Sequence, residues 1–516
     1  MPTARCSDPP PLPGCDPLFA AAAMREADRR ASEDHHIPSI VLMERAGLAA
    51  SREILAAYPS RGRAVIAVGR GNNGGDGMVV ARHLAEAGWV VACVSATGEG
   101  PATPDAALMT GIAATIGIGV TVPDDPGVPW DDAVLVDALL GTGATGAPRE
   151  AEAGLIARIA EAGGPVVALD VPSGVDADTG RVEGAAVRAA LTVTFHGDMP
   201  GLRVAPGAAR AGRVVVADIG IPSAVATPAA AWASSAGTLA AAPHKAAASD
   251  KYGSGAVLVI GGSPGLTGAP CLSARATLRA GAGLAVVAVP EAVQPAVAAH
   301  LLEVMSAGLP DEDGHLAPAS VGPALRQAGR AGAVAIGPGL GRAAATSAAV
   351  HELLARLELP VVLDADGLWH LGDDPGAALA SRPAPTVLTP HAGEAGRLLG
   401  RERARVEADR LAAAADLVEA TGAVVVLKGA GTIVAAPGVA PIVDRVATPA
   451  LATAGTGDVL TGVIAAFLAA GMPARDAAAV AVVAHGRAGA LAGNGDGTVA
   501  SDVVEALPRA LAGTPG

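Results

Sequence analysis

The chain has 516 residues, which is too long for one hydrophobic core and predicts two or three domains. Hydrophobic residues make up 51% and charged residues 17% of the chain, a balance typical of globular proteins rather than disordered ones. The net charge is −14 and aromatic residues amount to 2%, which excludes a broad basic surface or a base-stacking platform for nucleic acid.

The cysteines and the apolar runs bear on the cellular compartment. An apolar stretch at residues 459–470 is interrupted by Thr461 and Gly462, so no membrane-spanning segment is expected. The N-terminus lacks a basic-then-apolar signal pattern. We therefore expect a cytoplasmic protein that binds neither nucleic acid nor membrane. Four scattered cysteines without a C-x-x-C pair predict free thiols in a reducing compartment: Cys6, Cys15, Cys93 and Cys271.

Residues 1–19 are rich in proline and predict a disordered extension, because clustered prolines nucleate neither helix nor sheet. A helical pattern begins at Ala21, and short apolar runs then alternate with Ala-rich helical stretches, as a parallel α/β sheet requires. A first domain is predicted for residues 20–225. Its strands are expected at residues 64–68, 90–94, 134–136, 166–169, 191–194 and 214–217.

Residues 226–243 lack charge and periodicity and are predicted to form a linker. A second α/β series follows in residues 244–513. Its strands are expected at residues 256–260, 285–289, 333–336, 361–363, 386–388 and 424–427. The sequence therefore predicts the α/β class, with two separate domains.

A glycine-rich loop follows the first predicted strand. Residues 69–74 satisfy G-x-G-x-x-G, the signature of a redox dinucleotide fold, but no acidic residue stands where that fold needs one after the second strand. A helix is expected from Met78, and free N–H groups at a helix start bind phosphate. Asn73 and Asp76 can add oxygen ligands for a hard cation. The alternative is a plain turn between strand and helix.

Two further strands end in a carboxylate that a flexible loop follows. Asp137 precedes the glycine-rich residues 141–146, and Asp170 precedes Ser173 and Gly174. One aspartate at such a place usually caps a helix or forms a turn. Because ligands of open parallel sheets bind beyond the carboxyl ends of the strands, the three loops are expected to line one crevice.

The segments GRGNNGGDG, VDALLGTGATG and ALDVPSGVDADTG, with HIPSIVLMERAG before them, resemble the NAD(P)H-hydrate epimerase family over about residues 20–225. The resemblance implies a Rossmann-like three-layer domain that epimerises the hydrated nicotinamide ring at C6. It also implies a potassium ion held by Asn73, Asp137 and Ser173. Asp170 and Asp137 are the two plausible carboxylates for acid/base catalysis, and Asp170 is our candidate because a carboxylate bound to a metal is a poorer base. The substrate contacts implied are Asn72, Asn73, Gly74, Gly75, Asp76, Gly141, Thr142, Gly143, Ala144, Thr145, Gly146, Ala147 and Asp170.

The second domain carries a different anion site. No G-K-[S/T] triplet occurs, which excludes a P-loop. Residues 452–458, ATAGTGD, precede an apolar helix; their N–H groups could bind a phosphate, and Asp458 could accept a proton from a substrate hydroxyl. The alternative is a glycine turn with a capping aspartate. His391 and Lys428 each follow a predicted strand, and Lys428 could hold a phosphate as a point charge.

The motifs TPHAGE, LKGAGT and ATAGTGD, with GPGLG and LDADGL, resemble the NAD(P)H-hydrate dehydratase family, which has a ribokinase-like α/β fold, over about residues 240–513. The resemblance implies that Asp458 assists attack of the substrate's C6 hydroxyl on a nucleotide phosphate, with Mg²⁺ present, before phosphate leaves. Family members often carry His-Lys-Gly where this chain has DKYGSG at residues 250–255, which leaves the role of Lys251 open. The contacts implied with the hydrated dinucleotide are Ala269, Gly339, His391 and Asp458. The contacts implied with ADP are Lys428, Gly429, Ala430, Gly431, Thr432 and Gly457.

Together the two resemblances predict a bifunctional enzyme, both isomerase and lyase. It would epimerise the R and S forms of hydrated NADH or NADPH and dehydrate the S form at the expense of ADP, with K⁺ and Mg²⁺ as cofactors, in a homo-oligomer. Two alternatives stay open. The second domain could be a small-molecule kinase of the ribokinase-like group, which would share the GTGD loop, and the first could be a non-catalytic binding module. The pairing of two activities that repair both epimers of one damaged cofactor favours the bifunctional enzyme.

Overall fold

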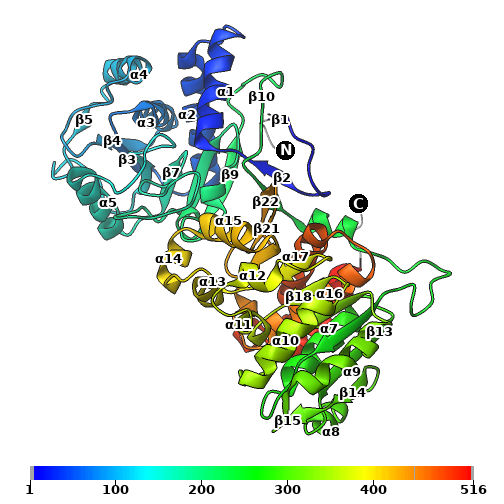
Figure 1. Ribbon diagram of the computed structural model, residues 1–516. Coiled ribbons are helices and arrows are strands. Elements are labelled where there is room, and N and C mark those ends of the chain that lie inside the picture. The colour runs from blue at the N-terminus through cyan, green and yellow to red at the C-terminus, as the bar shows by residue number, and fades with distance from the viewer. Residues whose placement is uncertain (1–4, 447, 513–516) are drawn as a thin grey trace. The chain divides into compact units, whose positions relative to one another are not determined.

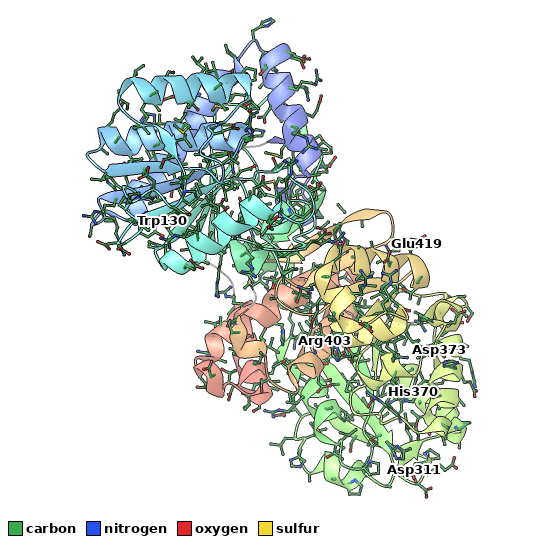
Figure 2. All side chains as sticks on the ribbon, turned by 90° about the vertical axis from the view of Figure 1, so that its left-hand side faces the viewer. Trp130, Asp311, His370, Asp373, Arg403 and Glu419 are labelled. Atoms are coloured by element: carbon green, nitrogen blue, oxygen red, sulfur yellow. The ribbon has the colours of Figure 1, made fainter. Side chains whose placement is uncertain are left out.

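A computed structural model describes residues 5–446 and 448–512. The chain divides into two compact units. The first unit holds the chain up to Pro9 together with Pro17–Ala231, and the second holds Pro10–Asp16 together with the chain from Trp232 onward. Side chains fill the space between the helices and strands of each unit (Figure 2).

The first unit is built on a parallel sheet of seven strands, which lies between two layers of helices (Figure 1). Ile66 packs with helices α2–α4 on one face, while its neighbour Val65 packs with α5 on the other, so the strands are apolar on both sides. The strand order is β5 (Val120–Thr121), β4 (Val90–Val94), β3 (Arg63–Val68), β6 (Val134–Ala138), β7 (Val166–Leu169), β8 (Leu191–Phe195) and β9 (Arg213–Ala217). The helices are α1 (Ala21–Glu33), α2 (Ser39–Ala57), α3 (Asn72–Glu86), α4 (Pro104–Thr115), α5 (Glu150–Ala162) and α6 (Ala208–Ala211), with a 3₁₀ turn η1 (Pro200–Leu202).

The second unit also contains a mainly parallel sheet. Its strands are parallel from β14 to β20, and the hairpin strands β21 and β22 then pair antiparallel. The order is β14 (Met305–Leu309), β13 (Leu284–Pro290), β12 (Ala256–Ile260), β17 (Ala333–Ile336), β18 (Val361–Leu363), β19 (Thr386–Leu388), β20 (Val424–Leu427), β21 (Ile433–Ala436), β22 (Val439–Asp444) and β11 (Ala231–Ser234). A separate hairpin pairs β15 (Asp311–Glu312) with β16 (His315–Leu316).

The helices of the second unit surround this sheet. They are α7 (Gly268–Arg279), α8 (Gln294–Ala298), α9 (Pro318–Ala328), α10 (Ala344–Arg356), α11 (Asp366–Trp369), α12 (Pro375–Leu379), α13 (Ala392–Leu398), α14 (Arg403–Ala408), α15 (Arg410–Thr421), α16 (Thr456–Ala469), α17 (Ala474–Ala492) and α18 (Ala500–Leu511). The 3₁₀ turns are η2 (Ala236–Ala241), η3 (Pro449–Leu451) and η4 (Gly495–Gly497).

Helix α16 is apolar on every side because it is enclosed by α7, α17 and the strands β12 and β17. Only its N-terminus, which carries Thr456, Gly457 and Asp458, is rich in polar groups. Nowhere between residues 5 and 512, Ala447 aside, does a helix combine the length and apolarity needed to cross a membrane.

Every strand predicted from the sequence is present, with ends shifted by at most two residues. The prediction of a disordered extension is wrong for the described residues 5–19. Strand β1 (Arg5–Cys6) pairs with β10 (Ala226–Thr227), and Leu18 and Phe19 are almost fully buried in the first unit. Apolar residues between the prolines find buried positions, and prolines reduce the entropy lost when such a segment orders.

Residues 226–243, predicted to form a linker, contain the division between the two units after Ala231, but the segment is folded rather than irregular. The segment forms β10, β11 and the 3₁₀ turn η2, and all four residues of β11 are buried. Trp232 lies opposite Ile442 in a parallel pair with β22. Four apolar or small residues buried on both faces show neither alternation nor charge, which is why the segment resembled a linker.

Truncating Phe19 tests the corrected N-terminal segment. Its ring is 1% exposed, so we expect Phe19→Ala to lower the free energy of unfolding of the first unit by about 3–5 kcal/mol through the lost burial and the cavity left behind. Leu108→Ala is the matched control, because Leu108 is 55% exposed on α4 and its loss should change stability little. Denaturant unfolding of both variants makes the comparison, and equal stabilities would restore the disordered extension.

Candidate active sites

In the first unit, three loops follow β3, β6 and β7 at the same edge of the sheet. Helix α3 begins at Asn72 and not at Met78 as predicted, so residues 72–76 form its first turns. The helix can start there because glycine permits very close packing: a Cβ on Gly74 would lie 2.0 Å from the Gly69 carbonyl oxygen, and one on Gly75 would lie 2.6 Å from a side chain of α4.

The three residues expected to hold potassium converge on Leu140. The Ser173 hydroxyl donates to Asp137 Oδ1 at 2.6 Å and accepts the Leu140 N–H at 2.9 Å. The Asn73 amide Nδ2 donates to the Leu140 carbonyl at 2.9 Å and to the Leu169 carbonyl at 3.3 Å. Asn73 Oδ1 is buried without a hydrogen-bond partner among the described residues. A buried oxygen of this kind is costly unless something fills its place.

A cleft of about 740 Å³ opens beside this cluster. It is lined by Asp28, Asp76 and Asp170, together with residues 70–73 and 139–149. Asp170 accepts the Thr142 N–H at 2.7 Å. Gly141 fits closely against it, because a Cβ there would lie 2.8 Å from Asp170 Oδ2.

The carboxyl groups of the cleft oppose one another's ionisation. Burial raises the pKa of Asp170, and burial together with the charges of Asp170 and Asp28 raises the pKa of Asp76 well above its usual value. Desolvation and then Asp170 raise the pKa of Asp28 to about 6, although the Asp28 side chain still reaches solvent. Burial raises the pKa of Asp137 to about 6 against the opposing hydrogen bonds from Ser173.

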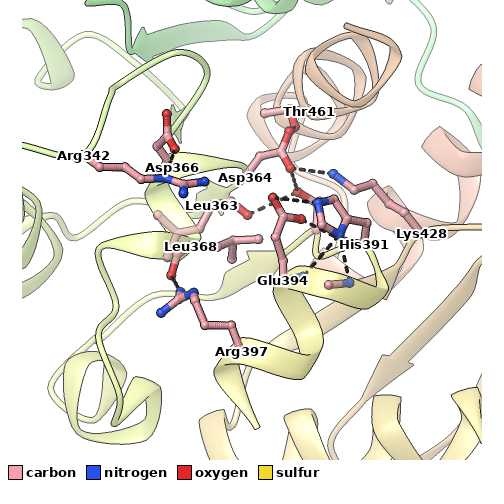
Figure 3. Close-up of polar contacts among 12 residues, drawn as sticks. Arg342, Leu363, Asp364, Asp366, Leu368, His391, Glu394, Arg397, Lys428 and Thr461 are labelled. Atoms are coloured by element: carbon pink, nitrogen blue, oxygen red, sulfur yellow. Dashed lines mark hydrogen bonds and ion pairs between the residues drawn. The ribbon is translucent and has the colours of Figure 1, made fainter. Parts of the chain in front are cut away.

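Asp364, which follows β18, organises the site in the second unit. It is 1% exposed, and Lys428 Nζ lies 2.7 Å from its Oδ1. Thr389 Oγ1 donates to Oδ1 and Thr461 Oγ1 donates to Oδ2, both at 2.8 Å. Figure 3 shows Asp364, Lys428 and Thr461 pointing toward one another. Lys428 is the largest of the factors that lower the pKa of Asp364 against its burial, so both groups stay charged.

Asp458 lies in the first turn of α16, close to this ion pair. A Cβ on the preceding Gly457 would lie 3.2 Å from Lys428 Nζ and 3.8 Å from Asp364 Oδ2. The Ser273 hydroxyl on α7 donates to the Asp458 carbonyl at 2.8 Å. Burial and then the charge of Asp364 raise the pKa of Asp458 to about 7, with Lys428 opposing them. The carboxyl group can therefore gain or lose a proton near neutrality.

The loop expected to bind ADP rests on a buried arginine. The Arg410 guanidinium is 4% exposed and donates to the carbonyls of Leu427 at 3.1 Å and Lys428 at 3.3 Å, and also to that of Ala430. Gly429 adopts a φ of +139°, which side chains rarely tolerate. These contacts hold residues 427–430 in one conformation.

The other residues expected around the substrate lie in two places. Ala269 and Gly339 are adjacent, since a Cβ on Gly339 would lie 3.4 Å from the Ala269 Cβ. His391 caps α13, where its Nδ1 accepts the N–H groups of Gly393 and Glu394 at 3.0 and 3.2 Å. Glu394 connects His391 to the Asp364–Lys428 pair electrostatically.

Comparison with known proteins follows the same division of the chain. Residues 39–201 match a family model described as YjeF-related protein N-terminus, and residues 257–509 match one described as NAD(P)H-hydrate dehydratase. The bifunctional NAD(P)H-hydrate repair enzyme Nnr of Moorella thermoacetica is 41% identical over 517 residues, covering 96% of each chain. The chain belongs to the bifunctional NAD(P)H-hydrate repair enzymes.

A second relative agrees with this membership. The repair enzyme of Salinibacter ruber is 40% identical, again covering 96% of each chain. Among solved structures, an ADP/ATP-dependent NAD(P)H-hydrate dehydratase from Bacillus subtilis, co-crystallised with ATP and Mg²⁺, is 28% identical with a TM-score of 0.46 and covers 54% of this chain and 96% of its own. Family membership and the two sheets confirm the fold class expected from the sequence.

The sequence patterns assigned no role to three residues that contact or line the two candidate active sites. Asp364 lies in the LDADGL motif directly after the strand predicted at residues 361–363, but the motif does not show that Asp364 pairs with Lys428. Asp28 lies among charged residues of α1, and Arg410 begins α15; nothing in the local pattern separates either from a surface charge.

Lys251, whose role the sequence left open, is exposed, and its Nζ lies 5.2 Å from the centre of the Tyr252 ring.

Proposed function

We propose that the two units act in turn on one damaged cofactor. The first unit epimerises hydrated NADH or NADPH at C6, and the second dehydrates the S epimer with ADP as co-substrate. The observation that carries the proposal is a pair of separate carboxylate sites within a chain that aligns with bifunctional repair enzymes over 96% of its length.

For the epimerase site, the cleft supplies both binding and proton transfer. The N-terminus of α3 and its glycines present N–H groups to an anionic dinucleotide, which supports Asn72 to Asp76 and Gly141 to Ala147 as contacts. Asp170 is the acid/base group, because it faces the cleft and burial raises its pKa. It takes and returns the proton while the C6–O bond breaks and forms again.

The residues around Leu140 fit the potassium ion that the family resemblance implies. Asn73 Oδ1, buried and without a hydrogen-bond partner in the described chain, supplies a neutral oxygen, and Asp137 and Ser173 supply two more beside it. Potassium is held by such oxygen ligands and would offset the cost of burying Asp137. The ion would stabilise the loops that carry Gly141 and Asp170.

For the dehydratase site, Asp458 is the base. The C6 hydroxyl gives its proton to Asp458, its oxygen bonds to the β-phosphorus of ADP, and AMP leaves. Phosphate then departs from the new ester with the electrons of the C6–O bond and takes up the proton that C5 loses, and the C5=C6 bond returns. The Asp458 pKa of about 7 supports this role, since a base near neutrality works best with a matched pKa.

ADP binds to the N–H groups of residues 429–432 and of Gly457, with the side-chain charge of Lys428 close by. No group of three or more His, Cys, Asp or Glu side chains in residues 5–446 and 448–512 is arranged to hold a metal ion. Mg²⁺ typically binds through one or two carboxylates together with substrate phosphates. Glu394, beside the Asp364–Lys428 pair, would serve in that way and leave Asp458 free to act as the base. Mg²⁺ would neutralise charge on the transferred phosphate. Assembly into a homo-oligomer stays a prediction.

Exchanging one carboxyl group in each unit separates the two reactions. Asp170→Asn removes the proton-transfer group of the first unit. It should therefore slow epimerisation of the R hydrate by about 10²–10⁴-fold and leave dehydration of the S hydrate unchanged. Asp458→Asn should do the reverse, so each variant is the control for the other. Chiral separation of the hydrates and absorbance of restored NADH give the two rates. A wild-type protein that restored no NADH and phosphorylated an alcohol would support the kinase alternative.

The pH profile tests the role of Asp458. Only its ionised form can accept the hydroxyl proton, so kcat/KM for dehydration should rise with pH and reach half its plateau near pH 7, where its raised pKa lies. At pH 6 the rate should be about a tenth of the plateau. Measurement at saturating ADP keeps the ionisation of the nucleotide out of the profile. A rate independent of pH between 6 and 8 contradicts the assignment.

Potassium should stabilise the first unit as well as activate it. At constant ionic strength, replacing NaCl with KCl at 100 times its Kd should raise the free energy of unfolding by about 2.7 kcal/mol. Asn73→Ala removes the free Oδ1 and should abolish the difference between the two salts. Leu108→Ala, far from these oxygens in sequence and exposed, should keep it. Thermal unfolding gives the readout, and equal midpoints in both salts for the wild type contradict the site.

A further inference from the structure

Two arginines lie against one exposed tryptophan in the second unit. Trp369, the last residue of α11, is 41% exposed. The guanidinium carbon of Arg342 lies 4.3 Å from the centre of its ring, and that of Arg397 lies 4.8 Å from it. The indole thus carries two cations, which it attracts through its negative face.

The Arg342–Trp369–Arg397 group lies between the two loops proposed to hold the hydrated dinucleotide. Arg342 directly follows the GPGLG loop that contains Gly339, and Arg397 lies on α13, whose N-cap is His391. Asp366 connects Arg342 to the GPGLG loop, since it accepts the Arg342 Nε–H at 2.9 Å and the Gly341 N–H at 3.0 Å. Figure 3 shows Arg342 and Arg397 on the side of Asp364 away from Lys428.

The group carries positive charge that the protein leaves partly unused. Arg342 is 60% exposed, and within the described chain its two terminal nitrogens make no hydrogen bond. Arg397 donates to the carbonyls of Leu368 and Gly372, which bring no negative charge. Burial and the charge of Arg342 lower the pKa of Arg397, as expected of two cations beside one ring. Among the described residues, Asp366 is the one carboxylate hydrogen-bonded to either arginine, while Asp373 and Glu394 act on Arg397 through their charge.

We propose that Arg342, Trp369 and Arg397 bind a phosphate of the hydrated dinucleotide. The inference rests on the proposed function and extends it to the adenosine half of the substrate. The free nitrogens of Arg342 form a planar pair of donors that matches a phosphate group, and Trp369 offers an aromatic surface beside it. An anion here would relieve the repulsion between the arginines. ADP fits this arginine group less well, because the residues proposed to bind ADP, 428–432, belong to the loop after β20.

Two phosphates of the substrate have the required chemistry: the 2′-phosphate of the NADPH-derived hydrate and the pyrophosphate common to both hydrates. Arg342→Gln should raise KM for the hydrate about tenfold and leave kcat and the KM for ADP unchanged. Loss confined to hydrated NADPH identifies the 2′-phosphate, and equal loss with both hydrates identifies the pyrophosphate. Arg342→Lys keeps the charge without the paired donors and should fall in between.

Arg356→Gln is the matched control, since Arg356 is 53% exposed on α10 of the same unit and pairs with Glu352. It should leave every constant unchanged. An Arg342→Gln protein with the wild-type KM for both hydrates, or with a changed KM for ADP alone, overturns the inference while the proposed function stands. A wild-type protein that restores no NADH defeats the proposed function instead. Melting temperatures of the variants confirm that each is folded.

Discussion

Each unit depends on a buried aspartate at the carboxyl end of a parallel strand. Asp137 is 0% and Asp364 is 1% exposed. A carboxyl group so deep in a protein is costly unless donors satisfy its oxygens. The donors come from other loops: Ser173 binds Asp137, and Lys428 with Thr461 binds Asp364. Loops far apart in the chain are thereby held in one arrangement, and the candidate sites are built on them.

The two units use charge differently. In the second, Lys428 keeps Asp364 ionised, and the charge of Asp364 then raises the pKa of Asp458. Asp364 keeps its charge, and Asp458 beside it can gain or lose a proton near neutrality. In the first, burial raises the pKa of Asp170, and burial with the charges of Asp170 and Asp28 raises the pKa of Asp76, so the cluster holds a proton readily. A reversible epimerisation needs a proton taken and returned, whereas dehydration needs a base poised near neutrality.

The motifs in the sequence drew attention to many residues of both candidate sites because glycine and aspartate at strand ends are local signals. Their convergence follows from the topology, since parallel strands place these ends at one edge. Partners from ordinary segments could not be predicted in this way. Arg410 begins a helix with an unremarkable pattern, yet it donates to three carbonyls, one at the end of β20 and two in the loop that follows. Phe19 stands beside prolines that suggested disorder, although it is buried.

The linear chain alone specifies the two α/β series, the twelve predicted strands within two residues of their ends, and the segments that carry Asp137, Asp170 and Asp458. These features can be predicted from the spacing of apolar residues and from the positions of glycines, because both are properties of short stretches of sequence. The ion pair of Asp364 with Lys428 and the stacking of Arg342 on Trp369 arise only on folding. The reason is physical: burial and charge depend on residues that are distant in the chain, and no local pattern records which of them will meet.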